Sequence, residues 1–145
     1  MAKIHRSALV MHSAKTMFGL VNDIRSYPKF LPWCANAKLI SDGPSEMVAS
    51  LKIAKGKIGH KFTTRNQLSE NERIEMELID GPFKYLKGVW QFKPLHDHAC
   101  KVSLDLDFEF SGRLTAMALS TLFNEAANTM VDAFCKRAIE VYGER

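Results

Sequence analysis

Residues 112–142 read GRLTAMALSTLFNEAANTMVDAFCKRAIEVY, a run with no proline, whose only glycine is its first residue. Apolar residues recur in it at steps of three and four, the spacing of one face of an α-helix. They are Leu119, Phe123, Ala126, Met130, Phe134, Ala138 and Val141. Leu122, Ala127, Val131 and Ile139 widen this stripe. About thirty residues, each rising about 1.5 Å, make a rod of roughly 45 Å. We therefore expect a long C-terminal helix, about 112–142, that lies across a large apolar surface.

The composition is typical of a globular protein, since 46% of the 145 residues are apolar and 25% are charged. We expect one domain over residues 1–145. No apolar run reaches the length that spans a bilayer, and the N-terminus lacks the apolar segment of a signal peptide. Three widely spaced cysteines predict neither a disulfide framework nor a metal site, which favours a reducing cytoplasm. The net charge of +4 permits an acidic partner such as RNA or an anionic membrane surface.

The N-terminal part predicts a short strand followed by short helices. Ile4–Val10 is β-like, and Ser13 is a suitable N-cap for a helix that ends near Asn22. The next segment, Tyr27–Cys34, holds two prolines four residues apart, which exclude a long helix. Its large apolar side chains indicate an ordered turn that either plugs the core or rims an opening.

The middle of the chain changes to a period of two, which is typical of half-buried strands. The expected strands are Lys38–Ser41, Val48–Ile53, Ile58–Leu68, Arg73–Ile79, Phe83–Lys93 and Lys101–Phe110. Short turns between successive strands imply an antiparallel meander. The predicted fold class is therefore α+β, a curved antiparallel sheet of about six or seven strands wrapped around the C-terminal helix.

Cross-strand pairing can be predicted for the last hairpin. Placing Trp90 opposite Leu104 sets Leu86 opposite Phe108 on the same face, and Lys87 then faces Asp107 in a favourable charge pair.

The same reasoning on an earlier hairpin pairs Ile53 with Ile58 and Ala49 with Phe62. Leu51 then faces His60, which predicts that His60 points toward the covered face.

A strongly twisted sheet cannot stay in contact with a straight helix over its whole length, so a gap is expected between them. A gap of about 300–1,000 Å³, the size of a ligand site, would cost on the order of 7–24 kcal/mol if it stayed empty. That cost rivals the stability of a whole domain. We therefore expect the gap to be small, hydrated or filled by an apolar ligand.

Four stretches carry a resemblance to a known family: FGLVNDI at 18–24, YPKFLPWC at 27–34, GPFKYLKGVWQF at 81–92 and MVDAFCKRA at 130–138. They resemble the bacterial RatA / coenzyme Q-binding START-like family, within the polyketide cyclase/dehydrase-like superfamily. The resemblance implies the helix-grip fold. It also implies a bacterial cytoplasmic protein with one of two activities. One is binding of ubiquinone or another polyprenyl lipid in support of respiration, with peripheral contact at the inner membrane. The other is binding of the large ribosomal subunit, which blocks 70S association.

Our primary hypothesis is a hydrophobic-ligand-binding protein, and the ribosome-binding inhibitor is the alternative. A polyketide cyclase or dehydratase is a weaker third reading. The expected ligand-binding residues are Leu31, Trp33, His60, Phe62, Met76, Leu86, Trp90, Leu104, Phe108, Phe123, Met130 and Val131. For each apolar residue in this set, the alternative to ligand binding is that the side chain only packs in the protein core. His60 could donate to a quinone carbonyl or be a satisfied core histidine. Leu31 and Trp33 are either an entrance lip at a membrane or a plug.

A basic hairpin is the expected contact for ribosomal RNA or anionic lipid. Its residues are Lys52, Lys55, Lys57, Lys61 and Arg65. No aromatic residues alternate with these charges, so base stacking is not indicated, and no DNA partner is expected.

Catalytic and metal sites are not expected. The chain contains no G-x-S-x-G, glycine-rich phosphate loop or H-E-x-x-H motif, and no required cofactor is indicated. His96-Asp97-His98 has no third ligand nearby in sequence and is expected to be a solvated turn.

Overall fold

The computed structural model describes residues 2–55 and 58–143, which form a seven-stranded antiparallel sheet and helices. In chain order the elements are β1 (Ala2–Val10), α1 (Ala14–Asn22), the 3-10 turn η1 (Ile24–Ser26), α2 (Tyr27–Phe30), β2 (Cys34–Asp42), β3 (Glu46–Lys55), β4 (Ile58–Ser69), β5 (Arg73–Asp80), β6 (Phe83–His96), β7 (Ala99–Phe110) and α3 (Arg113–Tyr142). The strand order is β1-β7-β6-β5-β4-β3-β2, a meander whose last strand pairs with the first. The expected helix-grip architecture is confirmed.

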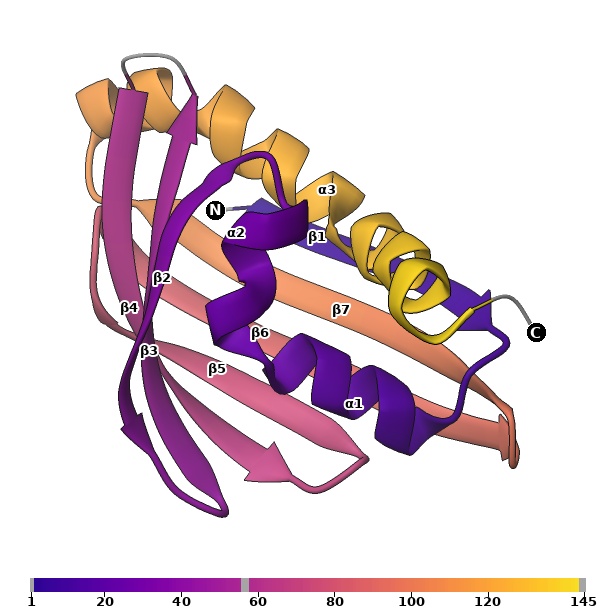
Figure 1. Cartoon of the computed structure of the whole chain (residues 1–145). Helices are drawn as coiled ribbons and strands as arrows, with labels where there is room; N and C mark the ends of the chain where they lie inside the picture. Colours follow the sequence, from indigo (N-terminus) through magenta and orange to yellow (C-terminus); the bar gives the residue numbers. More distant parts are fainter. Residues whose placement is uncertain (1, 56–57, 144–145) are drawn as a thin grey trace.

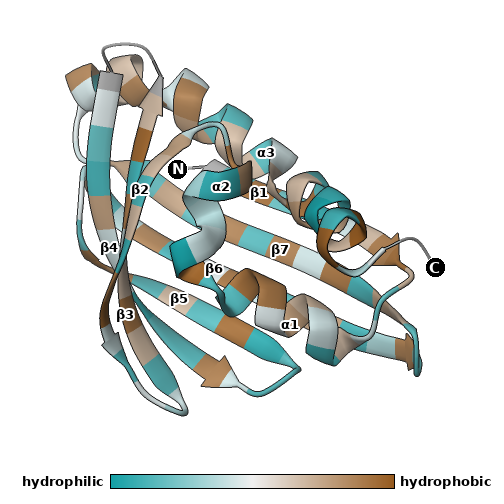
Figure 2. Cartoon of the chain, viewed as in Figure 1, coloured by the Kyte–Doolittle hydropathy of each residue, from teal (hydrophilic) through white to brown (hydrophobic). Residues whose placement is uncertain are grey.

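All three α-helices lie on one face of the curved sheet, and α3 runs along it (Figure 1). The strands alternate apolar and polar residues along their length (Figure 2). The apolar rows of β3 to β7 point toward the helices and form the core, while the polar rows face solvent.

Helix α3 matches its predicted extent closely. Gly112 precedes it and Gly143 follows it, and the Gly143 amide donates to the Ile139 carbonyl at 2.9 Å. Burial along its apolar stripe ends at Ala138. Ile139 and Val141 are almost half exposed, at 46% and 48%, because the last turn extends past the covered surface.

The predicted register of β6 and β7 is confirmed. Trp90 lies opposite Leu104, and Lys87 lies opposite Asp107. The predicted register of β3 and β4 is wrong by two residues, since the pairing continues to Lys55 and Ile58. A shift of two keeps every side chain on its own face. The apolar pattern therefore predicted the correct faces but could not distinguish the two registers.

The segment after β1 folds as expected up to its prolines. The Thr16 amide donates to the Ser13 hydroxyl at 3.1 Å, which confirms the N-cap of α1. The proline-framed segment contains the single helical turn α2. Leu31 and Trp33, which follow it, are buried. The structure therefore agrees with the plug and not with an exposed lip at a membrane.

One glycine is required by the turn between β5 and β6. Gly81 has a φ of +152°, a conformation that favours glycine, and an added Cβ would lie 2.6 Å from the Phe62 Cβ. This close approach sets the turn against the inner row of β4.

We expect Gly81→Ala to lower the free energy of unfolding by about 1–3 kcal/mol, because it adds both backbone strain and a clash with Phe62. The matched control is Gly19→Ala in α1, where an added Cβ meets nothing within 4 Å. That change should be neutral or raise the stability by up to about 1 kcal/mol. Urea unfolding of both variants measures the difference, and equal effects would contradict the strained turn.

Candidate functional site

Helix α3 is held to the sheet by two aromatic side chains. Phe123 packs against four phenylalanine rings of the sheet: Phe62, Phe83, Phe108 and Phe110. Three turns later Phe134 packs edge-on against Tyr27, Phe30 and Trp90, with ring centroids 5.2–5.4 Å apart. Between these two anchors the helix presents the smaller residues Ala126 and Ala127, so a space remains above the sheet.

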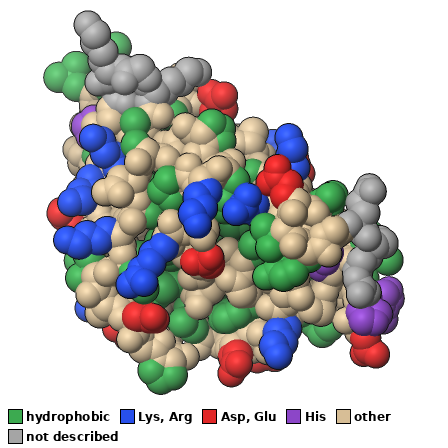
Figure 3. Space-filling model, viewed as in Figure 1, with side chains coloured by type: hydrophobic (Ala, Val, Ile, Leu, Met, Phe, Trp, Pro, Cys, Tyr) green, Lys and Arg blue, Asp and Glu red, His purple; other side chains and the backbone are tan. Residues whose placement is uncertain are grey.

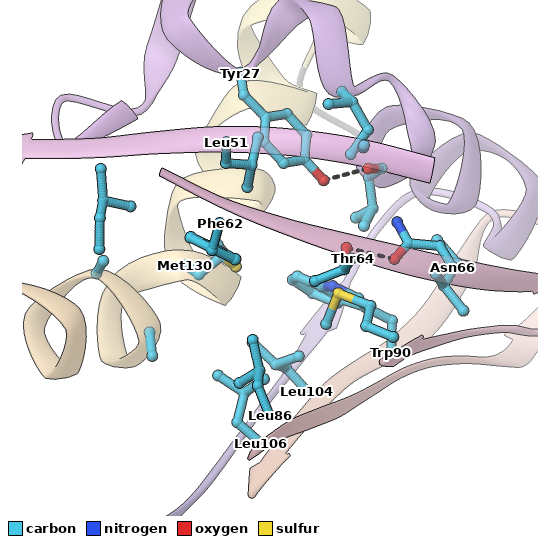
Figure 4. A pocket seen from close by; sticks show the side chains of 18 of the residues that line it. Tyr27, Leu51, Phe62, Thr64, Asn66, Leu86, Trp90, Leu104, Leu106 and Met130 are labelled. Carbon is cyan, nitrogen blue, oxygen red and sulfur yellow. Dashed lines mark hydrogen bonds between the residues drawn. The ribbon is translucent and has the colours of Figure 1, made fainter. Parts of the chain in front are cut away.

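This space is an apolar cavity of about 70 Å³ between α3, the sheet and the segment after α1. Figure 4 shows side chains from β4, β6, β7 and α3 converging on it. The predicted ligand-binding residues that line it are Trp33, Phe62, Met76, Leu86, Trp90, Leu104, Phe123 and Met130. The structure thus brings together residues from five elements and one connecting segment.

Four predicted ligand-binding residues lie outside the lining. Leu31, Phe108 and Val131 are buried in the core beside the cavity. The expectation that His60 reaches the covered space is wrong, since its side chain is exposed. His60 lies opposite Ile53 near the start of β4, and it is absent from the cavity lining although Ile53 belongs to it.

The polar groups at the cavity are Thr64, Asn66 and Tyr27, none of which is among the ligand-binding residues expected from the sequence. Thr64 and Asn66 follow Phe62 at steps of two on β4, and the Thr64 hydroxyl donates to the Asn66 side-chain oxygen at 2.8 Å. The alternation that predicted an inward Phe62 was the available signal for both residues.

Tyr27 is buried, and its hydroxyl donates to the Val21 carbonyl at the end of α1 (Figure 4). Burial raises its pKa well above the ordinary value, because the phenolate cannot be solvated there. Burial also raises the pKa of the neighbouring Cys34 thiol to about 11. At neutral pH both groups are uncharged, and the cavity wall around them is electrically neutral.

The cavity is much smaller than the gap of 300–1,000 Å³ considered from the sequence. An empty cavity of 70 Å³ costs only about 2 kcal/mol, which a domain of this size tolerates. It is also smaller than the cavity of about 150 Å³ that holds a benzene molecule. A quinone ring therefore fits only if the lining side chains move apart.

The outer face of β2 to β4 carries lysines without acidic partners. Lys52 and Lys61 lie directly opposite each other, and Lys38 lies one row away on the neighbouring strand. These three exposed residues form what we call the lysine surface, and none makes an ion pair within residues 2–55 and 58–143. Figure 3, which views the helix-covered side, shows several Lys and Arg side chains along the left edge, where β2 to β4 lie, with Asp and Glu side chains among them.

Two other residues of the predicted basic hairpin cannot be placed. Lys57 and the Lys55 side chain lie outside the described residues. Arg65 contributes less than expected, because its guanidinium lies 3.3 Å from the Glu46 carboxylate.

The charges on the other half of the outer face are mostly paired. Lys87 lies opposite Asp107, and Lys84 lies 3.5 Å from Glu109. Lys93 and Lys101 form a second pair of opposed lysines at one end of β6 and β7, so the lysine surface differs from it in extending to Lys38 on a third strand.

The described part of the chain contains no group of three or more His, Cys, Asp or Glu side chains that could hold a metal ion. None of its helices is long and apolar enough to cross a bilayer. His96 ends β6, and Asp97 and His98 form the exposed turn between β6 and β7.

Comparison with known proteins places these features in context. The family model described as polyketide cyclase / dehydrase and lipid transport matches residues 10–135. The chain is 51% identical over 140 residues to the Pseudomonas aeruginosa protein named "Ribosome association toxin RatA", with 97% of each chain covered. It is 27% identical to the Xenopus laevis protein named "Coenzyme Q-binding protein COQ10 homolog B, mitochondrial", covering 96% of this chain and 59% of the relative.

Solved structures share the fold at low sequence identity. The Zhui aromatase/cyclase of a Streptomyces species superposes with a TM-score of 0.83 at 14% identity and covers 99% of both chains. A START superfamily protein from Mycobacterium smegmatis gives 0.79 at 21% identity, covering 96% of this chain and 98% of that one. At these identities the likeness concerns the fold alone.

The polar wall of the cavity generates a prediction. Tyr27→Phe leaves the buried Val21 carbonyl without its donor, so the free energy of unfolding at pH 7 should fall by about 1–3 kcal/mol. Because the folded-state pKa of Tyr27 is raised, only the unfolded chain ionises this phenol just above pH 10, and stability is lost as pH rises. The difference between wild type and Tyr27→Phe in urea titrations should therefore shrink from about pH 9 to about pH 11.

The control is Tyr142→Phe, since the Tyr142 side chain is exposed. It should change the stability by less than about 0.5 kcal/mol at either pH. If the difference in the free energy of unfolding between wild type and Tyr27→Phe stays constant with pH, a buried neutral phenol at Tyr27 is ruled out.

Proposed function

This chain belongs to the polyketide cyclase/dehydrase and lipid transport family, and we propose that its role within that family is to associate with the ribosome. The proposal is supported by the relative named "Ribosome association toxin RatA", which is 51% identical and is covered almost end to end. In this proposal the chain acts in the bacterial cytoplasm by binding and performs no catalytic step. It binds the large subunit and so keeps the two subunits apart, as the family resemblance implies.

The observation that carries the proposal is the pairing of Lys52 with Lys61. Like charges directly opposite each other on two strands destabilise a sheet, and no acidic side chain described in the structure offsets them. A phosphate oxygen placed between them would relieve this repulsion. Lys38 extends the same surface across a third strand, so it can follow a phosphate backbone rather than a single ion.

Ribosomal RNA fits this surface better than a protein partner does. Exposed lysines gain affinity mainly through release of counterions from phosphates, which needs charge density but little shape complementarity. The lysine surface has no aromatic residue for base stacking. The residues two positions before and after Lys52 on β3, Ser50 and Ala54, are small. Contact through the phosphate backbone is therefore the expected mode.

The test is cosedimentation of the wild-type chain and of the double variant Lys52→Glu/Lys61→Glu with isolated ribosomal subunits over a range of salt concentrations. We expect wild-type binding to the large subunit to weaken as salt rises. The double variant should bind at least about tenfold more weakly, with a shallower salt dependence, since each lost phosphate contact lowers the slope by about 0.9 or less.

A matched control is Lys93→Glu/Lys101→Glu. These lysines are also exposed and directly opposite each other, but they lie on β6 and β7 at the other end of the sheet. This variant has the same net charge as the test variant and should retain binding. If both double variants lose binding equally, general charge and not the lysine surface is responsible. Absence of sedimentation of the wild-type chain with either subunit would refute the proposal itself.

A second candidate function is favoured by the enclosed cavity: binding of a small apolar ligand, such as the ring of a quinone. The cavity is lined almost entirely by carbon, and the Thr64–Asn66 pair supplies polar atoms at one side for a carbonyl oxygen. The Xenopus laevis relative named for coenzyme Q binding supports this candidate at lower identity. Because the ring exceeds the present volume, binding would require the lining to open.

This candidate predicts that chain purified from quinone-containing cells carries extractable quinone in stoichiometric amount. Ala49→Val adds two carbons to a buried cavity-lining position on β3 and suits a strand, so the folded chain should remain as stable within about 1 kcal/mol. It should reduce the bound quinone, because the added methyl groups occupy part of the 70 Å³. Quinone retention that is equal in both chains, or absent from wild type, contradicts ligand binding in this cavity.

A further inference from the structure

A polar pocket of about 220 Å³ lies at the end of the molecule where α1 begins, β6 turns into β7 and α3 ends (Figure 1). Its lining residues are His12, Ser13, Thr16, His98 and Tyr142. None of them lines the apolar cavity or belongs to the lysine surface. The pocket is therefore a separate site, which the proposed ribosome association does not use.

His12 is the residue that points to a ligand. Only 5% of it is exposed, yet its ring nitrogens have no hydrogen-bond partner in the part of the chain that the structure describes. Its ring lies against Tyr142, with centroids 6.1 Å apart and planes tilted by 53°. The unpaired ring nitrogens of His12 are not among the fully buried polar atoms, so they are reached from the pocket that His12 lines, where water or a ligand can accept or donate a hydrogen bond.

The start of α1 supplies donors to the same pocket. The Ser13 hydroxyl accepts from the Thr16 amide and donates to the Thr16 hydroxyl at 3.0 Å, so the Thr16 proton is left to donate elsewhere. The first amide groups of a helix have no intrahelical acceptor, and the helix dipole makes this end favourable for an anion. The helix is nine residues long, enough to carry that dipole.

The composition of the lining selects the kind of ligand. Every lining side chain can donate a hydrogen bond, and no carboxylate is among them. A metal ion would need more acceptor ligands than the two imidazoles provide. A tetrahedral oxyanion, in contrast, has several acceptor oxygens that can meet donors from α1, the β6–β7 turn and α3 at once.

We propose that this pocket binds a phosphate monoester group. The nearly complete burial of His12 favours a terminal phosphate, which can enter the pocket end-on, over an internal phosphodiester, which is flanked by sugar on both sides. Lys15 and Asp97 are exposed charges on the adjoining segments and are absent from the lining. The terminal phosphate can belong to a small metabolite or to the 5′ end of an RNA.

The test uses the full chain and amide NMR. Inorganic phosphate should shift the amide signals of Ala14, Lys15 and Thr16. The double variant Thr16→Val/His98→Ala should weaken phosphate binding by about tenfold or more, because it removes two donors to a charged group. His60→Ala is the matched control, since it removes an exposed histidine distant from the pocket, and it should leave the affinity unchanged.

Two RNA oligonucleotides of the same sequence, with and without a 5′-phosphate, separate the possible sources. Tighter binding of the phosphorylated RNA than of inorganic phosphate identifies RNA ends as the ligand. Equal binding of both phosphate probes identifies a free phosphate monoester. Binding of the unphosphorylated RNA at the α1 amides overturns the proposal in favour of the phosphodiester backbone. Unshifted α1 amides, or equal affinity in wild type and a folded double variant, show that there is no such site.

Discussion

The packing of α3 on the sheet through Phe123 and Phe134 is the interaction on which the rest of the structure depends. Each ring contacts several other aromatic rings at 4.7–6.3 Å; Phe123 contacts rings of β4, β6 and β7, and Phe134 contacts Trp90 farther along β6. Edge-on aromatic pairs add stabilisation beyond the area that they bury. The contacts of Phe123 and Phe134 together determine the distance of the helix from the sheet. The contacts of Phe134 also pack Tyr27 and Phe30 of the N-terminal segment against the core.

The cavity is a consequence of that arrangement. Two large side chains hold the helix at a distance, and the alanines between them cannot fill the space. Its small volume keeps the energetic cost near 2 kcal/mol, so the fold does not need a ligand to be stable. The small volume therefore argues against a ligand that is required for folding, while a ligand that can spread the lining remains compatible with the fold.

Charge is distributed unevenly over the outer face of the sheet. Lys84 and Lys87 of β6 lie beside Glu109 and Asp107, whereas Lys52 and Lys61 lie beside each other, as Lys93 and Lys101 do at one end of β6 and β7. The lysine surface is distinguished by its extent, because Lys38 continues the Lys52–Lys61 pair onto a third strand, and this extent is what suits it to a polyanion in the function that we propose. The phosphate pocket that we propose lies elsewhere, at the end of the molecule where α1 begins.

The sequence by itself determined the element types, the faces of the strands and the extent of α3, because periodicity and end signals are local properties. It predicted eight of the residues that line the cavity, since alternation identified inward residues such as Trp90 and Leu104, but it did not select the lining residues of β3 or α1. It also contained the signal for Thr64 and Asn66. Only the tertiary structure decided the register of β3 and β4, the volume of the cavity, the exposure of His60 and the burial of His12. These depend on distances between residues far apart in the chain, and a two-residue slip leaves the local pattern unchanged.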